Sequence, residues 1–139
     1  MSAALLDLPN APASAVLRES ERVSAPALRA FTAIADDWDL SSKERQAVLG
    51  LPASTYYALL KRVERARLSP DTLERISYVL GIYKALRILL PRREAHLAWL
   101  RHPNADPGFA GAAPLGVMTA GKVANLYRVR RYLDGERGW

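Results

Sequence analysis

Residues 54 to 67 carry side chains with the chemistry of a nucleic-acid contact. Four cations, Lys61, Arg62, Arg65 and Arg67, stand close together with a single acid, Glu64, among them. Lysine and arginine at this density suit phosphate groups, which supply much of the affinity of DNA-binding proteins. The whole chain has a net charge of +6, which fits a polyanion or an acidic protein surface as its partner.

The residues before this cluster have the order of a helix-turn-helix. Ser41 and Glu44 have capping-box spacing and start a short helix, which Gly50 would end. A second helix opens at Ala53, and in this motif its early residues face base edges. We expect Leu51, Tyr56 and Leu59 to hold the two helices together. The expected base-facing residues are Ser54, Thr55, Tyr57 and Lys61, and the expected phosphate contacts are Arg62, Arg65 and Arg67.

The motif departs from the common pattern in two ways. Gln46 stands four residues before the turn glycine, where a small residue is frequent. The expected base-facing set also contains no Arg, Asn or Gln, the residues that bind guanine or adenine bidentately. Direct readout would then depend on Ser54, Thr55 and Tyr57. The alternative interpretation is an ordinary helical hairpin with a solvated basic end.

The composition argues against other classes of function. The chain has no cysteine and two histidines, His96 and His102, so neither a disulfide nor a thiolate metal site is possible. We find no nucleophile–base pair and no glycine-rich cofactor motif, and we expect no enzyme activity, no cofactor and no metal, including at Asp36, Asp37 and Asp39. No apolar run reaches the length of a membrane span, and the first residues lack the basic region of a signal peptide. A cytoplasmic protein is therefore expected.

The apolar spacing predicts an all-α fold, a compact cluster of about seven helices. A flexible arm is expected over residues 1–24, with a short helix near 16–22. Ser24 would cap the next helix and Pro26 would lie in its first turn. Ser69 and Pro70 would start the longest helix, which ends before Pro91. Shorter helices should end near His102, start at Pro114 and run from about 123 to a tail at 134–139, and Trp38 and Trp99 should be core residues.

The second half of the chain contains several motifs in a recognisable order. Trp99-Leu100 is followed by Pro103-Asn104, then by Gly111 with Pro114-Leu115, then by Gly121 and the pair Tyr132-Leu133. From about Ala27 to its end, the chain resembles the Xre/MbcA/ParS-type antitoxins. It differs from them at Ala112 and Ala113, where a Lys or Thr is frequent.

The resemblance implies a function and a set of partners. Such antitoxins combine an N-terminal DNA-binding region with a C-terminal domain that covers a RES-domain toxin, an NAD-depleting enzyme, and blocks its active site. The pair represses its own operon, and the antitoxin usually forms a homodimer. The implied organisation is an arm at 1–24, a helix-turn-helix region at 25–67 and a toxin-binding domain at 68–139.

The C-terminal residues are the candidates for toxin contact. They are Arg130, Arg131, Asp134, Glu136, Arg137 and Trp139. A pocket that binds the pyrophosphate of NAD is expected to be positive, so we hypothesise that Trp139 and its acidic neighbours plug it. The alternative is that Trp139 covers the core of its own domain. Two further alternatives concern the whole protein: a stand-alone regulator without a toxin, and an inhibitor whose helix-turn-helix no longer contacts DNA.

Overall fold

The structure of the chain is a computed structural model that describes residues 13–138. This range contains seven α-helices and no strand, which confirms the all-α prediction. The helices are α2 (Ala13–Asp37), α3 (Ser42–Leu49), α4 (Ala53–Lys61), α5 (Pro70–Leu89), α6 (Arg93–Arg101), α7 (Pro114–Met118) and α8 (Val123–Glu136). Two short 3-10 turns, η1 (Val63–Arg65) and η2 (Pro107–Phe109), lie between them. None of the helices in this range is long and apolar enough to cross a membrane.

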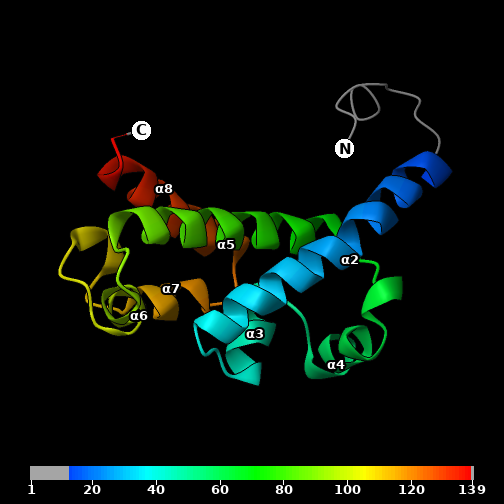
Figure 1. Cartoon of the computed structure of the whole chain (residues 1–139), viewed down its shortest axis with the longest axis horizontal. Coiled ribbons are helices and arrows are strands. Elements are labelled where there is room, and N and C mark those ends of the chain that lie inside the picture. The colour runs from blue at the N-terminus through cyan, green and yellow to red at the C-terminus, as the bar shows by residue number, and fades with distance from the viewer. Residues whose placement is uncertain (1–12, 139) are drawn as a thin grey trace.

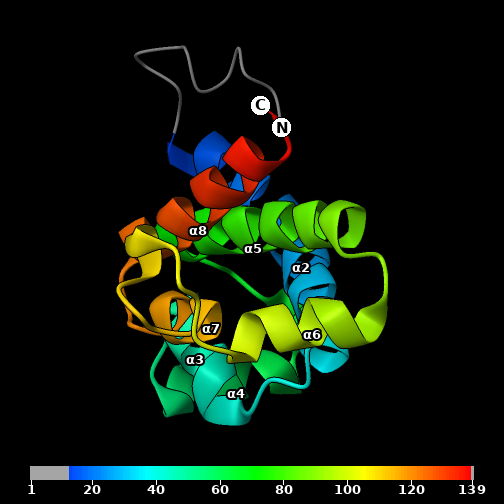
Figure 2. The ribbon, with the colours of Figure 1, turned by 90° about the vertical axis from the view of Figure 1, so that its left-hand side faces the viewer.

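The helices form two layers that α2 crosses (Figures 1 and 2). Helices α5 and α8 lie side by side in the upper layer, and α3, α4, α6 and α7 lie below them. Helix α5 is the centre of the fold because it packs against both α2 and α8. Its buried face includes Ile76, Val79, Ile82 and Leu86. One helix thus contacts the elements that precede it and the elements that follow it.

The start of the first helix differs from the prediction. Helix α2 begins at Ala13 and continues through Pro26, so the expected arm boundary at residue 24 lies inside it. Ser24 is not an N-cap: its side chain is buried, and its hydroxyl accepts a hydrogen bond from the N–H of Leu68 at 2.9 Å. A proline inside a helix usually kinks or breaks it. Here Pro26 lies on the exposed face of α2, and the packing of the opposite face, which includes the buried Leu28, stabilises the continuous helix.

The start of α5 agrees with the prediction. Ser69 is the N-cap, with its hydroxyl accepting from the N–H of Thr72 at 3.1 Å, and Pro70 occupies the first turn. Farther along, Gly81 is buried where α8 crosses, and a Cβ there would collide with the guanidinium of Arg130. Glycine at this position therefore leaves room for the Arg130 side chain where α5 and α8 pack together.

The two tryptophans lie at different depths. Trp38 is buried, with 1% of its surface exposed, as expected of a core residue. Trp99 is half-buried and packs on the core within an aromatic group that it forms with Phe109 and Tyr132. Its ring lies 5.9 Å from that of Phe109, which in turn lies 5.0 Å from Tyr132. This group holds α6, η2 and α8 together.

Candidate functional site

The helix-turn-helix forms at the predicted residues. Ser41 caps α3 in a capping box with Glu44, and Gly50 ends it in the left-handed conformation, with φ of 69°. Helix α4 begins after Pro52, at the predicted Ala53, and ends at Lys61. Tyr56 is buried, and Leu51 and Leu59 pack on the core, as expected for the residues that hold the two helices together.

The predicted base-facing residues lie on the exposed outer face of α4. Ser54, Thr55, Tyr57 and Lys61 are all exposed, which base contact requires. Tyr57 leaves 46% of its surface open although its ring lies 5.3 Å from that of Tyr56. The structure therefore places the predicted base-facing side chains together on one outer surface. Their contact with DNA stays a prediction.

The basic cluster divides into paired and unpaired cations. Arg67 forms an ion pair with Glu21 at 2.8 Å. Glu64, the single acid of the cluster, is paired with Arg29 at 2.6 Å. Among the side chains that the structure describes, no carboxylate forms an ion pair with the other three cations, Lys61, Arg62 and Arg65. These three line a shallow hollow at the end of α4, together with Glu64, whose charge is paired with Arg29. They are available for phosphate groups.

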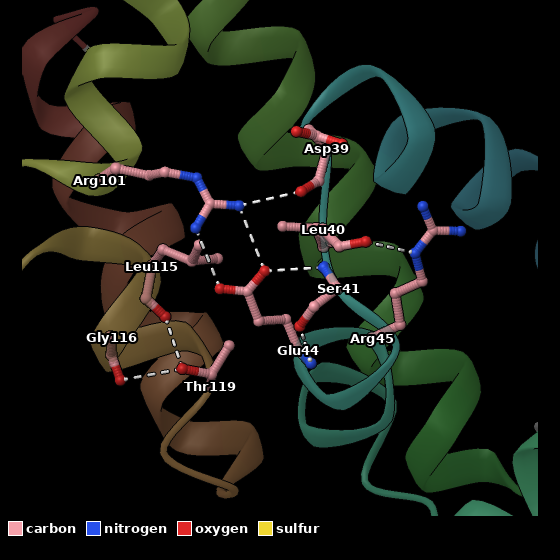
Figure 3. A network of polar contacts seen from close by, with 9 residues as sticks. All are labelled: Asp39, Leu40, Ser41, Glu44, Arg45, Arg101, Leu115, Gly116 and Thr119. Atoms are coloured by element: carbon pink, nitrogen blue, oxygen red, sulfur yellow. Dashed lines mark hydrogen bonds and ion pairs between the residues drawn. The ribbon is translucent and has the colours of Figure 1, made fainter.

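An arginine from the second half of the chain holds the start of α3 (Figure 3). The guanidinium of Arg101, in α6, donates to both carboxylate oxygens of Glu44 at 3.1 and 3.2 Å and to the carbonyl of Asp39 at 3.1 Å. Burial alone would raise the pKa of Glu44. The hydrogen bonds from Arg101 and from the N–H of Ser41 outweigh burial and lower that pKa below its usual value. The Glu44 carboxylate is therefore charged at neutral pH and can form the ion pair with Arg101.

A second arginine holds the end of α3. Arg75, in α5, is only 8% exposed, and its guanidinium donates to the carbonyls of Val48 at 3.4 Å and Gly121 at 3.0 Å. Asp71 accepts from its Nε at 2.8 Å. A Cβ at Gly50 would lie 2.6 Å from Cζ of Arg75, so the turn glycine also makes room for this side chain. Arg75 thereby joins the helix-turn-helix to the segment before α8.

Sequence reasoning missed both arginines. The signal that could have found Arg75 is its place beside Ile76 and three residues after Thr72, on the face of α5 that becomes buried. A charged residue at such a position needs a set of hydrogen-bond acceptors. No comparable signal pointed to Arg101, because Glu44 was already used by the capping box.

The candidate toxin contacts are only partly surface residues. Arg130 donates to Asp134 at 3.0 Å within α8 and packs over Gly81, so both residues contribute to the fold. The expected tail at 134–139 is wrong at its start. Helix α8 continues to Glu136, because the Arg130–Asp134 pair spans its last turns and the N–H of Arg137 donates to the carbonyl of Leu133 at 3.1 Å.

The remaining residues of this set lie in three different settings. Arg131 and Glu136 are exposed on α8, whereas Arg137 is half-buried and makes further contacts. Trp139 lies outside the described residues. The structure thus brings Arg131 and Glu136 to the surface of one helix, and the plug hypothesis stays a prediction.

His96, in α6, is buried beside the rings of Trp38 and Tyr83. Its Nε2 accepts a hydrogen bond from the indole N–H of Trp38 at 2.8 Å. Burial lowers the pKa of His96; Asp37 opposes this effect, and Arg87 and Arg93 add to it. The hydrogen bond requires an unprotonated Nε2, so His96 is neutral in the folded protein. Among the described residues, no group of His, Asp and Glu has the arrangement of a metal site.

Comparisons with known proteins divide the chain into two matched parts. Residues 17–81 match the family model of the antitoxin Xre-like helix-turn-helix domain. Residues 85–138 match the antitoxin Xre/MbcA/ParS C-terminal toxin-binding domain. The chain is also similar to the uncharacterized protein y4oB of Sinorhizobium fredii, with 43% identity over 120 residues, which cover 86% of this chain and 90% of that protein.

Proposed function

This chain belongs to the Xre/MbcA/ParS family of antitoxins, and from that premise we propose that it blocks an NAD-depleting RES-domain toxin and represses its own operon. Its two matched parts are a helix-turn-helix domain and a toxin-binding domain. The toxin's class, the repression of its own operon and a homodimer that reads paired half-sites belong to the proposal.

One observation supports the DNA-binding part most strongly. Lys61, Arg62 and Arg65, which have no ion pair among the described side chains, lie at the end of the helix whose outer face carries Ser54 and Tyr57. A base-facing surface and a phosphate-binding surface are thus adjacent, as an operator requires. The same observation argues against a helix-turn-helix that has lost its contact with DNA.

The salt dependence of operator binding tests this part. Each of Lys61→Ala, Arg62→Ala and Arg65→Ala should lower the slope of log affinity against log salt by about 0.9, the value for one phosphate contact. Arg67→Ala should change the slope less, because Glu21 already neutralises that side chain. Lys84→Ala, an exposed cation of α5, serves as the control. Equal slopes for all of these variants would contradict a phosphate-binding role of the cluster.

The toxin-blocking part is tested by co-expression. When produced alone, the product of the adjacent gene, if it is the proposed toxin, should stop growth and lower cellular NAD, and this chain should restore both. A stable complex should also co-purify. A neighbouring protein that is not toxic, or a toxicity that this chain does not relieve, would instead support a stand-alone DNA-binding regulator.

Truncation of the C-terminus tests the plug hypothesis, and it must remove fewer residues than the predicted tail at 134–139, because α8 extends to Glu136. Removing residues from 134 onward would delete Asp134, which pairs with Arg130 inside α8. Removing 137–139 leaves that pair intact. If the tail enters the toxin's pocket, this truncation should weaken inhibition strongly. Unchanged inhibition and unchanged affinity for the toxin would exclude the plug.

A further inference from the structure

A groove runs along the outer side of α8, at the end of the molecule that carries η2. Its volume is about 570 Å³. The buried or half-buried side chains of Phe109, Val117 and Tyr132 form its floor, and the exposed side chains of Tyr127, Arg128 and Arg131 line its rim. All of these residues lie within the part that matches the toxin-binding domain. None of them belongs to α3 or α4.

The wall of the groove is fixed by polar contacts. Arg128 donates to the carbonyl of Gly108 at 2.7 Å, which ties η2 to α8. The N–H of Gly108 donates to the side chain of Asp106 at 3.0 Å, and this bond closes the turn. The ring of Phe109 is held at 5.0 Å from that of Tyr132. A partner would therefore find the groove already formed and would lose little free energy in ordering it.

The rim defines the chemistry of the partner. Two arginines line the groove and no carboxylate does. Arg131 is exposed and, among the described side chains, has no ion pair. Tyr127 leaves 46% of its surface open, although its ring lies 5.7 Å from that of Tyr78. Exposed tyrosine and arginine beside an apolar hollow are typical anchors of protein interfaces.

We propose that this groove is where the toxin docks, with an apolar side chain of the toxin on the floor and a toxin carboxylate against Arg131. The inference rests on the proposed function and names the surface that performs it. A protein fits better than nucleic acid, since the floor is apolar and the unpaired cations near α4 belong to a separate surface. The groove also differs from the tail beyond Glu136, so the two contacts can be tested independently.

Charge reversal on the rim tests the docking surface. The probe is the toxin of the proposed function, taken as the product of the adjacent gene, inactivated by substitution in its active site and titrated by calorimetry. Arg131→Glu and Tyr127→Ala should each weaken binding by roughly tenfold or more. Arg92→Glu makes the same change of charge at an exposed site in the same domain, outside the groove, and should stay within about twofold of wild type. Operator affinity and melting temperature of each variant report on the fold.

Each outcome decides the proposal. Selective loss of toxin binding in the two groove variants supports it. Toxin binding at wild-type strength in both variants overturns it. A change only in the oligomeric state of the antitoxin without toxin also overturns it, because the occupant would then be a second copy of this chain. A loss only of operator affinity overturns it in favour of nucleic acid. Failure of the wild-type chain to bind the toxin at all refutes the proposed function itself, which separates the two failures.

Discussion

Helices α3 and α4 make up one motif and have nearly the same length, eight and nine residues, yet they are held in different ways. Helix α3 has a capping box at its start, and arginines from α6 and α5 bind near its two ends. Helix α4 has no side-chain cap, and Tyr56 is its single buried residue. The protein therefore fixes the supporting helix and leaves the other helix open to a ligand.

This difference separates stability from recognition within one motif. A substitution at the supports of α3 removes contacts with α5 or α6, so it should act on the free energy of unfolding. A substitution on the outer face of α4 removes no such contact and should act on operator affinity alone. The variants below test this separation, from the largest expected effect to the smallest.

Gly50→Val should destabilise the protein most. Valine strongly disfavours a φ of 69°, and its Cβ would lie 2.6 Å from Cζ of Arg75. We expect a loss of about 3 kcal/mol in the free energy of unfolding, measured with urea. Gly111→Val is the matched control because it has a φ of 81° with no atom near the added Cβ, and it should lose about 1–2 kcal/mol. Equal losses would mean that contact with Arg75 is unimportant.

Arg75→Met should have the next largest effect. Methionine keeps much of the buried stem but leaves the carbonyls of Val48 and Gly121 without this donor. The expected loss is about 2 kcal/mol, again from urea unfolding. Lys84→Met, at an exposed site on the same helix, should change stability by less than about 0.5 kcal/mol. A loss as small in Arg75→Met would show that the guanidinium does not stabilise the fold.

The same substitution in each helix compares them directly. Ser41→Ala removes the N-cap of α3 and should cost about 1 kcal/mol. Ser54→Ala changes an exposed residue of α4 and should cost less than about 0.5 kcal/mol, while it weakens operator binding. Thermal unfolding and operator titration of both variants provide the measurements. The comparison fails if Ser54→Ala is the more destabilising of the two.

Mild acid should destabilise the protein through His96 of α6, and this is the smallest of the expected effects. The pKa of His96 is lowered in the folded protein, so below the ordinary value of about 6.5 the unfolded chain binds a proton that the folded chain does not. Stability should therefore fall between pH 7 and pH 5.5. His96→Gln should reduce this fall in melting temperature, whereas His102→Gln, at an exposed site, should keep it. An identical pH dependence in all three proteins would exclude His96 as the cause.

The parts of the fold that could be predicted depend on neighbours in sequence. The caps at Ser41 and Ser69 involve partners three residues away, so their spacing was visible. Ser24 was misinterpreted as a cap because its hydroxyl binds Leu68, 44 residues later. Arg75 and Arg101 reach acceptors 46 and 57 residues away, and no local pattern indicates such a distance.

The candidate sites follow the same rule. The outer face of α4 was predictable because helical spacing alone separates Ser54, Thr55 and Tyr57 from the buried Tyr56. The groove beside α8 was not predicted, because its floor combines residues of η2, α7 and α8 that only the folded chain brings together.

Helix α5 also constrains how this protein can change over generations. The two family matches stop and resume at residues 81 and 85, inside that one helix. Suppose that recombination inside α5 joined the first half of this chain to the second half of a distant relative. Gly81 would then face the α8 of the relative, and Arg75 would face the relative's segment at the position of Gly121. With the operator and toxin surfaces proposed on α4 and α8, we expect new partners to be acquired by point substitutions on each surface and not by recombination of whole halves.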